Sequence, residues 1–445
     1  MKFGGTSIKD GLAFARVAEI VRERVDQRPV VVTSAMSRVT DALIACVRMT
    51  AEDDTVRAVR SLEPHFERHL QVALMLGRPA RTEMRILVDH ARREIADILS
   101  DTATARPRSA RSHDLIASYG ERLSANLLML VLREVGVPAS YLDARGCILT
   151  DERHGCARPL IRETYRRTRN QLKLLLREKR VPVLGGFIAS DRTGVTTTMG
   201  RGSSDLTATI VSAALGARET QIWTDVDGVL TADPQLVSLA FTVAQLSYTE
   251  AAELARLGSR VLHSKMIQPV IKQGIPIRVC NAQAPEKSGT LICDSTNGPR
   301  GSVKAIAHTP NITAIEITST PSFVANGFMR ALKRSFQHHQ LGFEIIGASN
   351  VGVSLACREE ELPPLLIRRL RHLGSVVIER GRSIVACIGA GLKEPGNSGH
   401  CGDQLKAIDP SLKWQSTSQF NLVATVASDS ARPTIKGLHY ALFGR

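Results

Sequence analysis

Aromatic residues are scarce in this chain, and acidic residues are fewer than basic ones. Phe, Trp and Tyr make up 4% of the 445 residues, while 58 Lys and Arg against 43 Asp and Glu leave a net charge of +15. Such a charge would suit nucleic-acid binding, but the arginines are spread over many expected helices and no RNA- or DNA-binding module is visible. The sequence therefore argues against a nucleic-acid partner, and the positive field suits small anionic ligands instead.

Cysteine pairs, a signal peptide and long apolar runs are also missing. The 8 cysteines contain no CxxC pair, which leaves a zinc site without support. Dispersed cysteines without a signal peptide are typical of a reducing cytoplasm, where we expect them to be reduced and buried. No apolar run reaches the ~18–20 residues that a membrane helix needs. The sequence thus predicts a soluble, cytoplasmic protein with no membrane partner.

Apolar strand-like runs alternate with helical patterns through the first two-thirds of the chain. The runs that read as buried strands lie at residues 29–34, 181–186, 220–226 and 275–281. The helical patterns between them lie at residues 123–135, 162–179 and 205–215. This alternation predicts an α/β fold, a largely parallel sheet sandwiched by helices. Residues 51–111 are helical and Arg-rich without a strand signal, so we expect a helical insertion there, at one side of the ligand cleft.

A cluster of turn-forming residues at 294–301 marks a domain boundary. Beyond it we expect strands at residues 312–317, 343–346, 351–356, 376–379 and 383–389, and helices at residues 327–338 and 362–373. The residues themselves predict only a separate α+β region. The expected division is therefore a first domain over 1–294 and a second region over 302–445.

The first motif is the hexapeptide Lys2-Phe3-Gly4-Gly5-Thr6-Ser7. Two glycines let the backbone approach an anionic group closely, and a helix that follows directs its free N–H groups to the same place. Ser7 with Asp10 three residues later predicts a capping box at the start of that helix. A lysine beside such a turn suits phosphoryl groups, although an ordinary strand–turn–helix connection would carry the same pattern.

Three more motifs follow in order, at residues 185–188, 200–205 and 223–229. Together with the hexapeptide they resemble the aspartate kinases (aspartokinases), which have the amino-acid-kinase fold followed by C-terminal tandem ACT regulatory domains. The resemblance extends over nearly the whole chain. It implies ATP-dependent phosphorylation of the side-chain carboxylate of L-aspartate to 4-phospho-L-aspartate, the first step of lysine, threonine and methionine biosynthesis. It also implies a homodimer or a higher homo-oligomer.

Phosphoryl transfer needs alignment and charge stabilisation rather than covalent help from the protein. We assign the electrostatic role to Lys2, with the backbone amides of Gly4 and Gly5 as further donors to the nucleotide phosphates. Asp205 can orient Lys2 or the substrate ammonium group, or can serve only as an N-terminal helix cap. These residues form the expected catalytic group.

Four residues are expected to bind the amino-acid substrate. The planar guanidinium of Arg201 can hold the α-carboxylate by two parallel hydrogen bonds. Glu121 lies in a segment, residues 119–123, that resembles the family's substrate-binding glutamate motif, which implies contact with the substrate ammonium group. Ser34 and Thr40 match hydroxyl contacts of the family to the amino acid.

The nucleotide is expected at the end of the strand that closes with Thr224 and Asp225, because ligands bind at the carboxyl edge of parallel sheets. In the family this segment carries adenine and ribose contacts. Leu230 and Gln235 stand where the family typically has an aromatic residue and an arginine, and Arg260 stands where it has a lysine. Mg²⁺ bridging the ATP phosphates is implied by the chemistry, but no protein ligand set for the metal can be read from the sequence.

Other positions depart from the family pattern. Ser203 replaces a glycine, and Ser264 replaces a proline. Only Met1 precedes Lys2, which predicts a first strand that is nearly absent, a start that lies upstream, or a poorly anchored lysine. These changes allow a specialised or weakened paralogue.

An amino-acid effector is expected at the ACT region, through Ser322, Glu344, Ser349 and Asn350. Its identity cannot be predicted, because a commoner Thr-Ser-Glu in the family is Ala-Ser-Asn here. Two alternatives to the aspartokinase reading stay open. One is a kinase for another amino-acid-like carboxylate, and the other is a weakly active ligand-sensing partner of another kinase.

Overall fold

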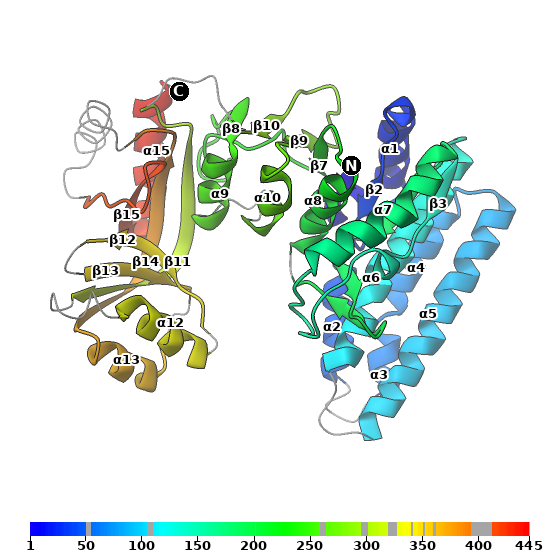
Figure 1. Ribbon diagram of the computed structural model, residues 1–445, viewed down its shortest axis with the longest axis horizontal. Helices are drawn as coiled ribbons and strands as arrows, with labels where there is room; N and C mark the ends of the chain where they lie inside the picture. The colour runs from blue at the N-terminus through cyan, green and yellow to red at the C-terminus, as the bar shows by residue number, and fades with distance from the viewer. Residues whose placement is uncertain are drawn as a thin grey trace. The chain divides into compact units, whose positions relative to one another are not determined.

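A computed structural model of the chain consists of two compact units. The first comprises Met1–Gly228 and Lys265–Asp294, and the second comprises Val229–Ser264 and Ser295–Arg445 (Figure 1). The structure describes residues 1–49, 55–104, 110–200, 202–258, 264–294, 301–318, 327–339, 341–349, 352–358, 362–392 and 412–444.

The first unit is built on a largely parallel sheet, which confirms the expected α/β fold. Its strands run in the order β3-β4-β2-β1-β7-β9-β10, and all neighbours are parallel except β10, which is antiparallel to β9. The strands are β1 (Lys2–Phe3), β2 (Val31–Thr33), β3 (Ala139–Tyr141), β4 (Val181–Gly185), β7 (Thr220–Thr224), β9 (Ile277–Asn281) and β10 (Thr290–Cys293). Every residue of β2 and β4 is buried, as expected of apolar strands covered by helices on both faces.

Strand β1 is short but lies in the middle of this sheet. Lys2 is opposite Val32 of β2 on one side and Ile222 of β7 on the other. The ring of Phe3 is fully buried and stacks on Trp223 at 5.9 Å between centroids. The expectation of a nearly absent first strand therefore fits its length, but the expectation of a poorly anchored lysine is wrong.

The first helix begins later than its sequence predicts. Gly5–Ile8 form a 3₁₀ turn, and α1 (Gly11–Arg22) starts after Asp10, whose side chain accepts a hydrogen bond from the Ala13 amide at 2.9 Å. Ser7 is buried, and its hydroxyl donates to the Trp223 carbonyl of β7 at 3.4 Å. The predicted capping box at Ser7 is wrong because that hydroxyl is used by the sheet, so Asp10 caps the helix.

Helices cover the first unit's sheet and form the expected helical insertion. They are α2 (Val39–Met49), α3 (Thr55–Arg60), α4 (Glu63–Ala73), α5 (Arg78–Thr104), α6 (Ala110–Glu134), α7 (Ile161–Arg177) and α8 (Ser203–Leu215), with α10 (Ser264–Ile271) further along the chain. The insertion consists of α3, α4 and α5, and α5 runs alongside α4 (Figure 1). A small antiparallel pair, β5 (Ile188–Ser190) and β6 (Thr196–Thr198), leads into α8.

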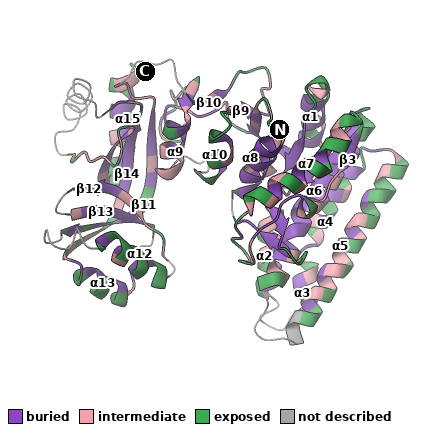
Figure 2. Cartoon of the chain, in the orientation of Figure 1, coloured by how far each residue is buried: buried purple, intermediate pink, exposed green. Residues whose placement is uncertain are grey.

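Helix α6 is the central helix of this unit. Among the described residues it is the one helix long and apolar enough to cross a membrane by length and composition, yet 83% of its most apolar 18-residue window is buried inside the protein. Figure 2 shows it buried along most of its length. Such burial is that of a core helix, and it places the side chains of α6 next to the sheet.

The second unit contains an antiparallel sheet in the order β12-β13-β11-β14-β15. Its elements are β8 (Gln245–Ser247), α9 (Tyr248–Arg256), β11 (Ala305–Thr318), α12 (Phe328–His338), β12 (Glu344–Ala348), β13 (Gly352–Cys357), α13 (Pro364–Arg371), β14 (Ser375–Ile388), β15 (Asn421–Ala427) and α15 (Ser428–Phe443). Helices α12 and α13 pack on one face of the sheet through Leu332, Phe336, Leu366 and Leu370. Their other faces are exposed (Figure 2).

One strand replaces two that the sequence predicts. The expected strands at residues 376–379 and 383–389 are joined into β14, which continues through Gly381. Gly381 has φ +63°, a conformation open to glycine, and the pairing of β14 with β11 shifts register between Thr309 and Ala314. The residues that predict a turn therefore form an irregularity within one long strand.

The division into units also differs from the division at residue 294 in one respect. Val229–Ser264 belongs with the second unit, because Ala232 and Val237 share a core with Val385 and Ile435. The passage between units at residues 294 and 295 lies in the predicted turn cluster.

The cysteines follow their expected burial with one clear exception. Five described cysteines are buried, namely Cys46, Cys147, Cys280, Cys357 and Cys387. Cys156 is exposed, and Cys293 is partly buried. The expectation of burial is wrong for Cys156, which lies in a surface turn rather than in a regular element.

Candidate functional site

Lys2 and Asp205 form an ion pair at the carboxyl edge of the first unit's sheet. Lys2 Nζ lies 2.6 Å from Asp205 Oδ1, and the two side chains are 11% and 14% exposed. Asp205 is in the first turn of α8, and Lys2 precedes the glycine turn after β1. A Cβ atom on Gly5 would lie 2.9 Å from the Ala35 carbonyl oxygen, so this turn has no room for a side chain. The ammonium group of Lys2, held by Asp205, thus lies near a backbone turn that carries no side chains at Gly4 and Gly5.

A cavity of about 380 Å³ in the first unit gathers four of the predicted residues, Gly5, Ser34, Thr40 and Glu121. They come from the turn after β1, the end of β2, the start of α2 and the middle of α6. Gly200, Gly202 and Ser204 line the same cavity. The structure therefore brings the hydroxyl and carboxylate groups expected for the amino acid to one place.

Glu121 is the buried acid of this cavity. Its side chain sits on α6 with 3% exposure, and among the described residues its Oε2 has no hydrogen-bond partner. Burial raises the pKa of Glu121 to about 8, and a backbone hydrogen bond from Ala35 opposes the rise. A buried carboxylate with an open oxygen is suited to an ammonium group, which would supply both the charge and the missing donor.

The turn between β6 and α8 has the shape that its glycines predict, while Arg201 itself lies outside the described residues. Gly200 and Gly202 have φ angles of +87° and +75°, which side-chain-bearing residues rarely adopt. The Ser203 hydroxyl donates to the Gly200 carbonyl, and Ser203 is buried. The serine that replaces a family glycine therefore stabilises the turn by this buried hydrogen bond.

Thr224 and Asp225 line a second cavity, of about 190 Å³, also within the first unit. Ser7, Lys9 and Gln283 contribute to its walls. The Thr224 hydroxyl donates to Asp225 Oδ1 at 3.2 Å, so the two residues stabilise each other at the end of β7. A polar cavity at the carboxyl ends of parallel strands matches the place expected for a nucleotide.

The other predicted nucleotide residues lie elsewhere along the chain. Leu230 is partly buried in the second unit, where it forms a bridge with Thr242. Gln235 is exposed, and its backbone N–H donates to Asp233 Oδ1 at 2.9 Å. Arg260 lies outside the described residues.

Of the predicted effector residues, Glu344 is the one that forms an ion pair among the described residues. It opens β12, and Arg256 of α9 lies 3.6 Å from its carboxylate. Burial raises the pKa of Glu344 above its ordinary value, and Arg256 opposes the rise. Ser349 is exposed, and its hydroxyl donates to the Gly352 carbonyl at 3.3 Å. Ser322 and Asn350 lie outside the described residues.

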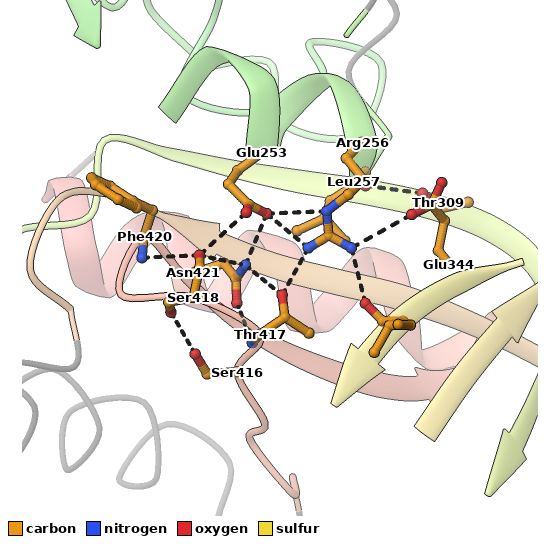
Figure 3. A network of polar contacts seen from close by, with 11 residues as sticks. Glu253, Arg256, Leu257, Thr309, Glu344, Ser416, Thr417, Ser418, Phe420 and Asn421 are labelled. Carbon is orange, nitrogen blue, oxygen red and sulfur yellow. Dashed lines mark hydrogen bonds and ion pairs between the residues drawn. The ribbon is translucent and has the colours of Figure 1, made fainter. Parts of the chain in front are cut away.

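Arg256 and Glu253 connect α9 to two segments of the second unit (Figure 3). Arg256 donates to the Ile345 carbonyl and to the Thr417 hydroxyl, each at 2.9 Å. Glu253 Oε2 accepts from Asn421 at 2.8 Å and from Arg256 at 2.7 Å. Helix α9 is thereby fixed to the start of β12 and to the start of β15.

Motif reasoning missed several residues that line the first cavity, most notably Asp114 and Thr198. Asp114 lies seven residues before Glu121 on α6, so helical spacing alone could have placed it on the same face. Within the part of the chain that the structure describes, no group of three or more His, Cys, Asp or Glu side chains could hold a metal ion.

Comparison with known proteins gives a consistent family. The model of the amino acid kinase family matches residues 1–281. Aspartokinase 3, chloroplastic, of Arabidopsis thaliana is 32% identical, with 100% of this chain and 81% of the relative covered. Lysine-sensitive aspartokinase 3 of Escherichia coli is 31% identical, with 99% and 98% covered.

Solved structures agree. E. coli aspartokinase III in complex with aspartate and ADP is similar at a TM-score of 0.85 and 29% identity, with 99% of each chain covered. Aspartate kinase of Clostridium acetobutylicum is similar at a TM-score of 0.77 and 25% identity, again with 99% of each chain covered. The chain belongs to the amino acid kinase family and, within it, to the aspartokinases.

Proposed function

We propose that this protein transfers the γ-phosphoryl group of ATP to the side-chain carboxylate of L-aspartate, giving ADP and 4-phospho-L-aspartate. The observation that carries the proposal is the open carboxylate oxygen of Glu121 in the 380 Å³ cavity. An acidic amino acid brings the ammonium group that this oxygen lacks. The Lys2–Asp205 pair beside the glycine turn supplies the cation for the transferring group.

The residues of the first unit divide the work. Lys2 stabilises the negative charge on the transferring phosphoryl oxygens, and Asp205 holds the ammonium group of Lys2 in place. The amides of Gly4 and Gly5 donate to the nucleotide phosphates. Glu121 binds the substrate ammonium group, while Ser34, Thr40 and Arg201 bind its carboxylates. Mg²⁺ would be held by the phosphates of ATP and would supply neutralisation of their charge, since the described residues offer no group of three or more His, Cys, Asp or Glu side chains for it.

The nucleotide is proposed at the cavity lined by Thr224 and Asp225 in the first unit. Leu230, Gln235 and Arg260 stay predictions from the sequence for nucleotide binding. Leucine and glutamine offer neither ring stacking nor a cation, so we expect weaker ATP binding than in a relative that has both groups. The second unit is proposed to bind an amino-acid effector near Glu344. E. coli aspartokinase III has been solved with lysine and aspartate, so lysine is the first effector to test. We propose a homodimer or a larger homo-oligomer as the working assembly.

The experiment is a coupled ADP-release assay with L-aspartate, L-glutamate and other acidic amino acids as acceptors. We expect turnover with L-aspartate. Turnover with another carboxylate alone would favour a related kinase, and no turnover with any acceptor would favour a ligand-sensing partner.

Lys2→Ala tests the mechanism in the same assay. We expect kcat to fall on the order of 10²–10³-fold, as when a donor to a developing negative charge is removed. Lys173→Ala, which removes an exposed lysine from α7, is the matched control and should leave kcat unchanged. Near-parental kcat in Lys2→Ala would remove Lys2 from the mechanism.

A further inference from the structure

The carboxylate of Asp114 is buried in the wall of the substrate cavity and is held by three neighbours. Asp114 is 2% exposed. Its Oδ1 accepts from the Thr198 hydroxyl at 2.5 Å, and both of its oxygens accept from the Gly155 amide, at 3.0 and 3.1 Å. His154 Nδ1 lies 2.8 Å from Oδ2. These contacts join α6 to the turn at residues 154–156 and to the end of β6.

Asp114 and Glu121 share α6 and the same cavity but have opposite hydrogen-bond states. Glu121 keeps one oxygen without a partner among the described residues, whereas both oxygens of Asp114 are occupied. A carboxylate can accept about four hydrogen bonds, and three protein groups contact the two oxygens of Asp114, with the Gly155 N–H shared between both. Most of its hydrogen-bonding capacity is therefore used within the protein, so it acts on the substrate through the segments that it holds.

Those segments lie next to Gly200, at the end of β6. The Gly155 carbonyl oxygen lies 3.4 Å from where a Cβ atom of Gly200 would stand, and the Ala157 amide donates to the Thr198 carbonyl at 2.9 Å. Thr198 is two residues before Gly200, at the end of β6. The position of the Gly200–Gly202 turn thus depends on the two segments that Asp114 ties to α6.

We propose that Asp114 is a positioning residue for the amino-acid substrate. It fixes the 154–156 turn and the end of β6 against α6, and so sets the distance between Gly200 and the carboxylate of Glu121, which line the same cavity. This inference rests on the proposed function for its substrate. The nucleotide cavity lined by Thr224 and Asp225 shares none of these segments, so ATP binding should not depend on Asp114.

The test compares KM for L-aspartate with KM for ATP in a set of full-length variants. Asp114→Ala leaves the buried Thr198 hydroxyl, the Gly155 amide and His154 without their acceptor, and we expect KM for L-aspartate to rise roughly 10–30-fold. KM for ATP should change less than about 2-fold. Asp114→Asn keeps one oxygen for Thr198 and Gly155 and offers an N–H group to His154, so it should restore most of the affinity. Thr198→Val removes one donor and should give a smaller change in the same direction.

Asp191→Ala is the matched control. Asp191 is also 2% exposed, and it accepts hydrogen bonds from Thr193 and Val195 in the turn between β5 and β6, but it does not line the cavity. Its loss should lower the melting temperature without separating the two KM values.

Two results would overturn the positioning role. One is an equal rise of both KM values in Asp114→Ala and Thr198→Val, and the other is a failure of Asp114→Asn to improve on Asp114→Ala. The parental enzyme is assayed first. Absence of L-aspartate turnover there would remove the proposed function, whereas parental turnover with unseparated KM values in the variants would remove only the role of Asp114.

Discussion

Three carboxylates near the substrate cavity differ in their partners, and the partners decide their chemistry. Asp205 is paired with Lys2, Asp114 is surrounded by donors, and Glu121 has one oxygen without a partner among the described residues. Burial raises the pKa of Glu121 to about 8, because the backbone hydrogen bond from Ala35 offsets only part of its effect. A carboxylate therefore orients a cation, holds backbone segments in place or is left able to bind a ligand, according to the groups that surround it.

The raised pKa of Glu121 predicts a pH-dependent affinity for L-aspartate. Below about pH 8 the carboxyl group is largely protonated in the free enzyme, and the substrate ammonium group favours its ionised form. KM for L-aspartate should therefore fall as the pH rises toward 8. In Glu121→Gln it should be higher and independent of pH over that range. The measurement is KM against pH for both proteins, and parallel profiles would contradict the assignment.

The same shift predicts that Glu121 lowers stability. Its folded-state pKa is about 8 against an ordinary value of 4.5, so ionisation is less favourable in the folded chain than in the unfolded chain. The folded state then loses stability as the pH rises from 4.5 through 8. Glu121→Gln should melt at a higher temperature than the parent at pH 8 and at a similar temperature near pH 4.5. A melting difference that does not grow with pH would exclude this origin.

At the scale of elements, helix α9 is attached by side-chain hydrogen bonds as well as by apolar packing. Asn421, which opens β15, is fully buried. Its Nδ2 group donates to Glu253 at 2.8 Å and to Thr417 at 2.9 Å, and its Oδ1 accepts from the Thr417 amide at 3.1 Å (Figure 3). One amide side chain thus joins α9 to the segment that precedes β15.

Asn421→Ala should lower the free energy of unfolding by about 2–3 kcal/mol. The substitution empties the fully buried position of Asn421, removes the acceptor of the Thr417 amide and takes one donor from Glu253, and the loss of a buried hydrogen-bonding group costs about 1–3 kcal/mol. Gln419→Ala, at an exposed neighbouring position, is the control and should be near neutral. Urea titrations followed by circular dichroism measure the difference. An Asn421→Ala midpoint equal to that of the control would mean that water replaces the lost contacts.

At the scale of the whole molecule, the compact units do not follow a single cut in the chain. Residues 229–264 lie between two parts of the first unit in sequence but pack with the second. The Ile306 amide donates to the Thr231 carbonyl at 2.7 Å, and Thr231 contacts His439 at 2.9 Å. Folding of the segment after β7 is therefore linked to the C-terminal sheet.

Val385→Ala tests this link in the full chain. Val385 is fully buried in β14 within the core that includes Val237, and its truncation should cost about 2 kcal/mol. Hydrogen exchange should become roughly 30-fold faster at protected amides of residues 229–243, since 1.4 kcal/mol is a factor of ten. Amides of β4 should be unaffected, and Val183→Ala in β4 should show the reverse pattern. Unchanged exchange at residues 229–243 would place that segment outside the second unit's cooperative fold.

Much of the fold and part of the site follow from short-range patterns. Apolar runs predict β4 and β9 because a strand buried on both faces needs apolar residues throughout. The Gly4-Gly5 and Gly200–Gly202 turns can be predicted from the sequence because few residues other than glycine tolerate close backbone approach or positive φ. Lys2 and Glu121 are predicted as site residues through the motifs that contain them. Each of these features depends on residues that are neighbours in the chain.

Tertiary structure decided the features that depend on distant partners. Ser7 has the residue type of a helix cap, but the Trp223 carbonyl takes its hydroxyl, and Asp10 caps α1 instead. The hydrogen-bond partners of Asp114 come from segments 40 to 84 residues away in the chain. The oxygen of Glu121 without a partner is likewise a result of the tertiary packing. Residues 229–264 belong to the second unit because some of them pack in a core whose other residues mostly come after residue 300. A buried polar group takes whatever donor or acceptor the packing places beside it, and packing joins segments that no local pattern connects.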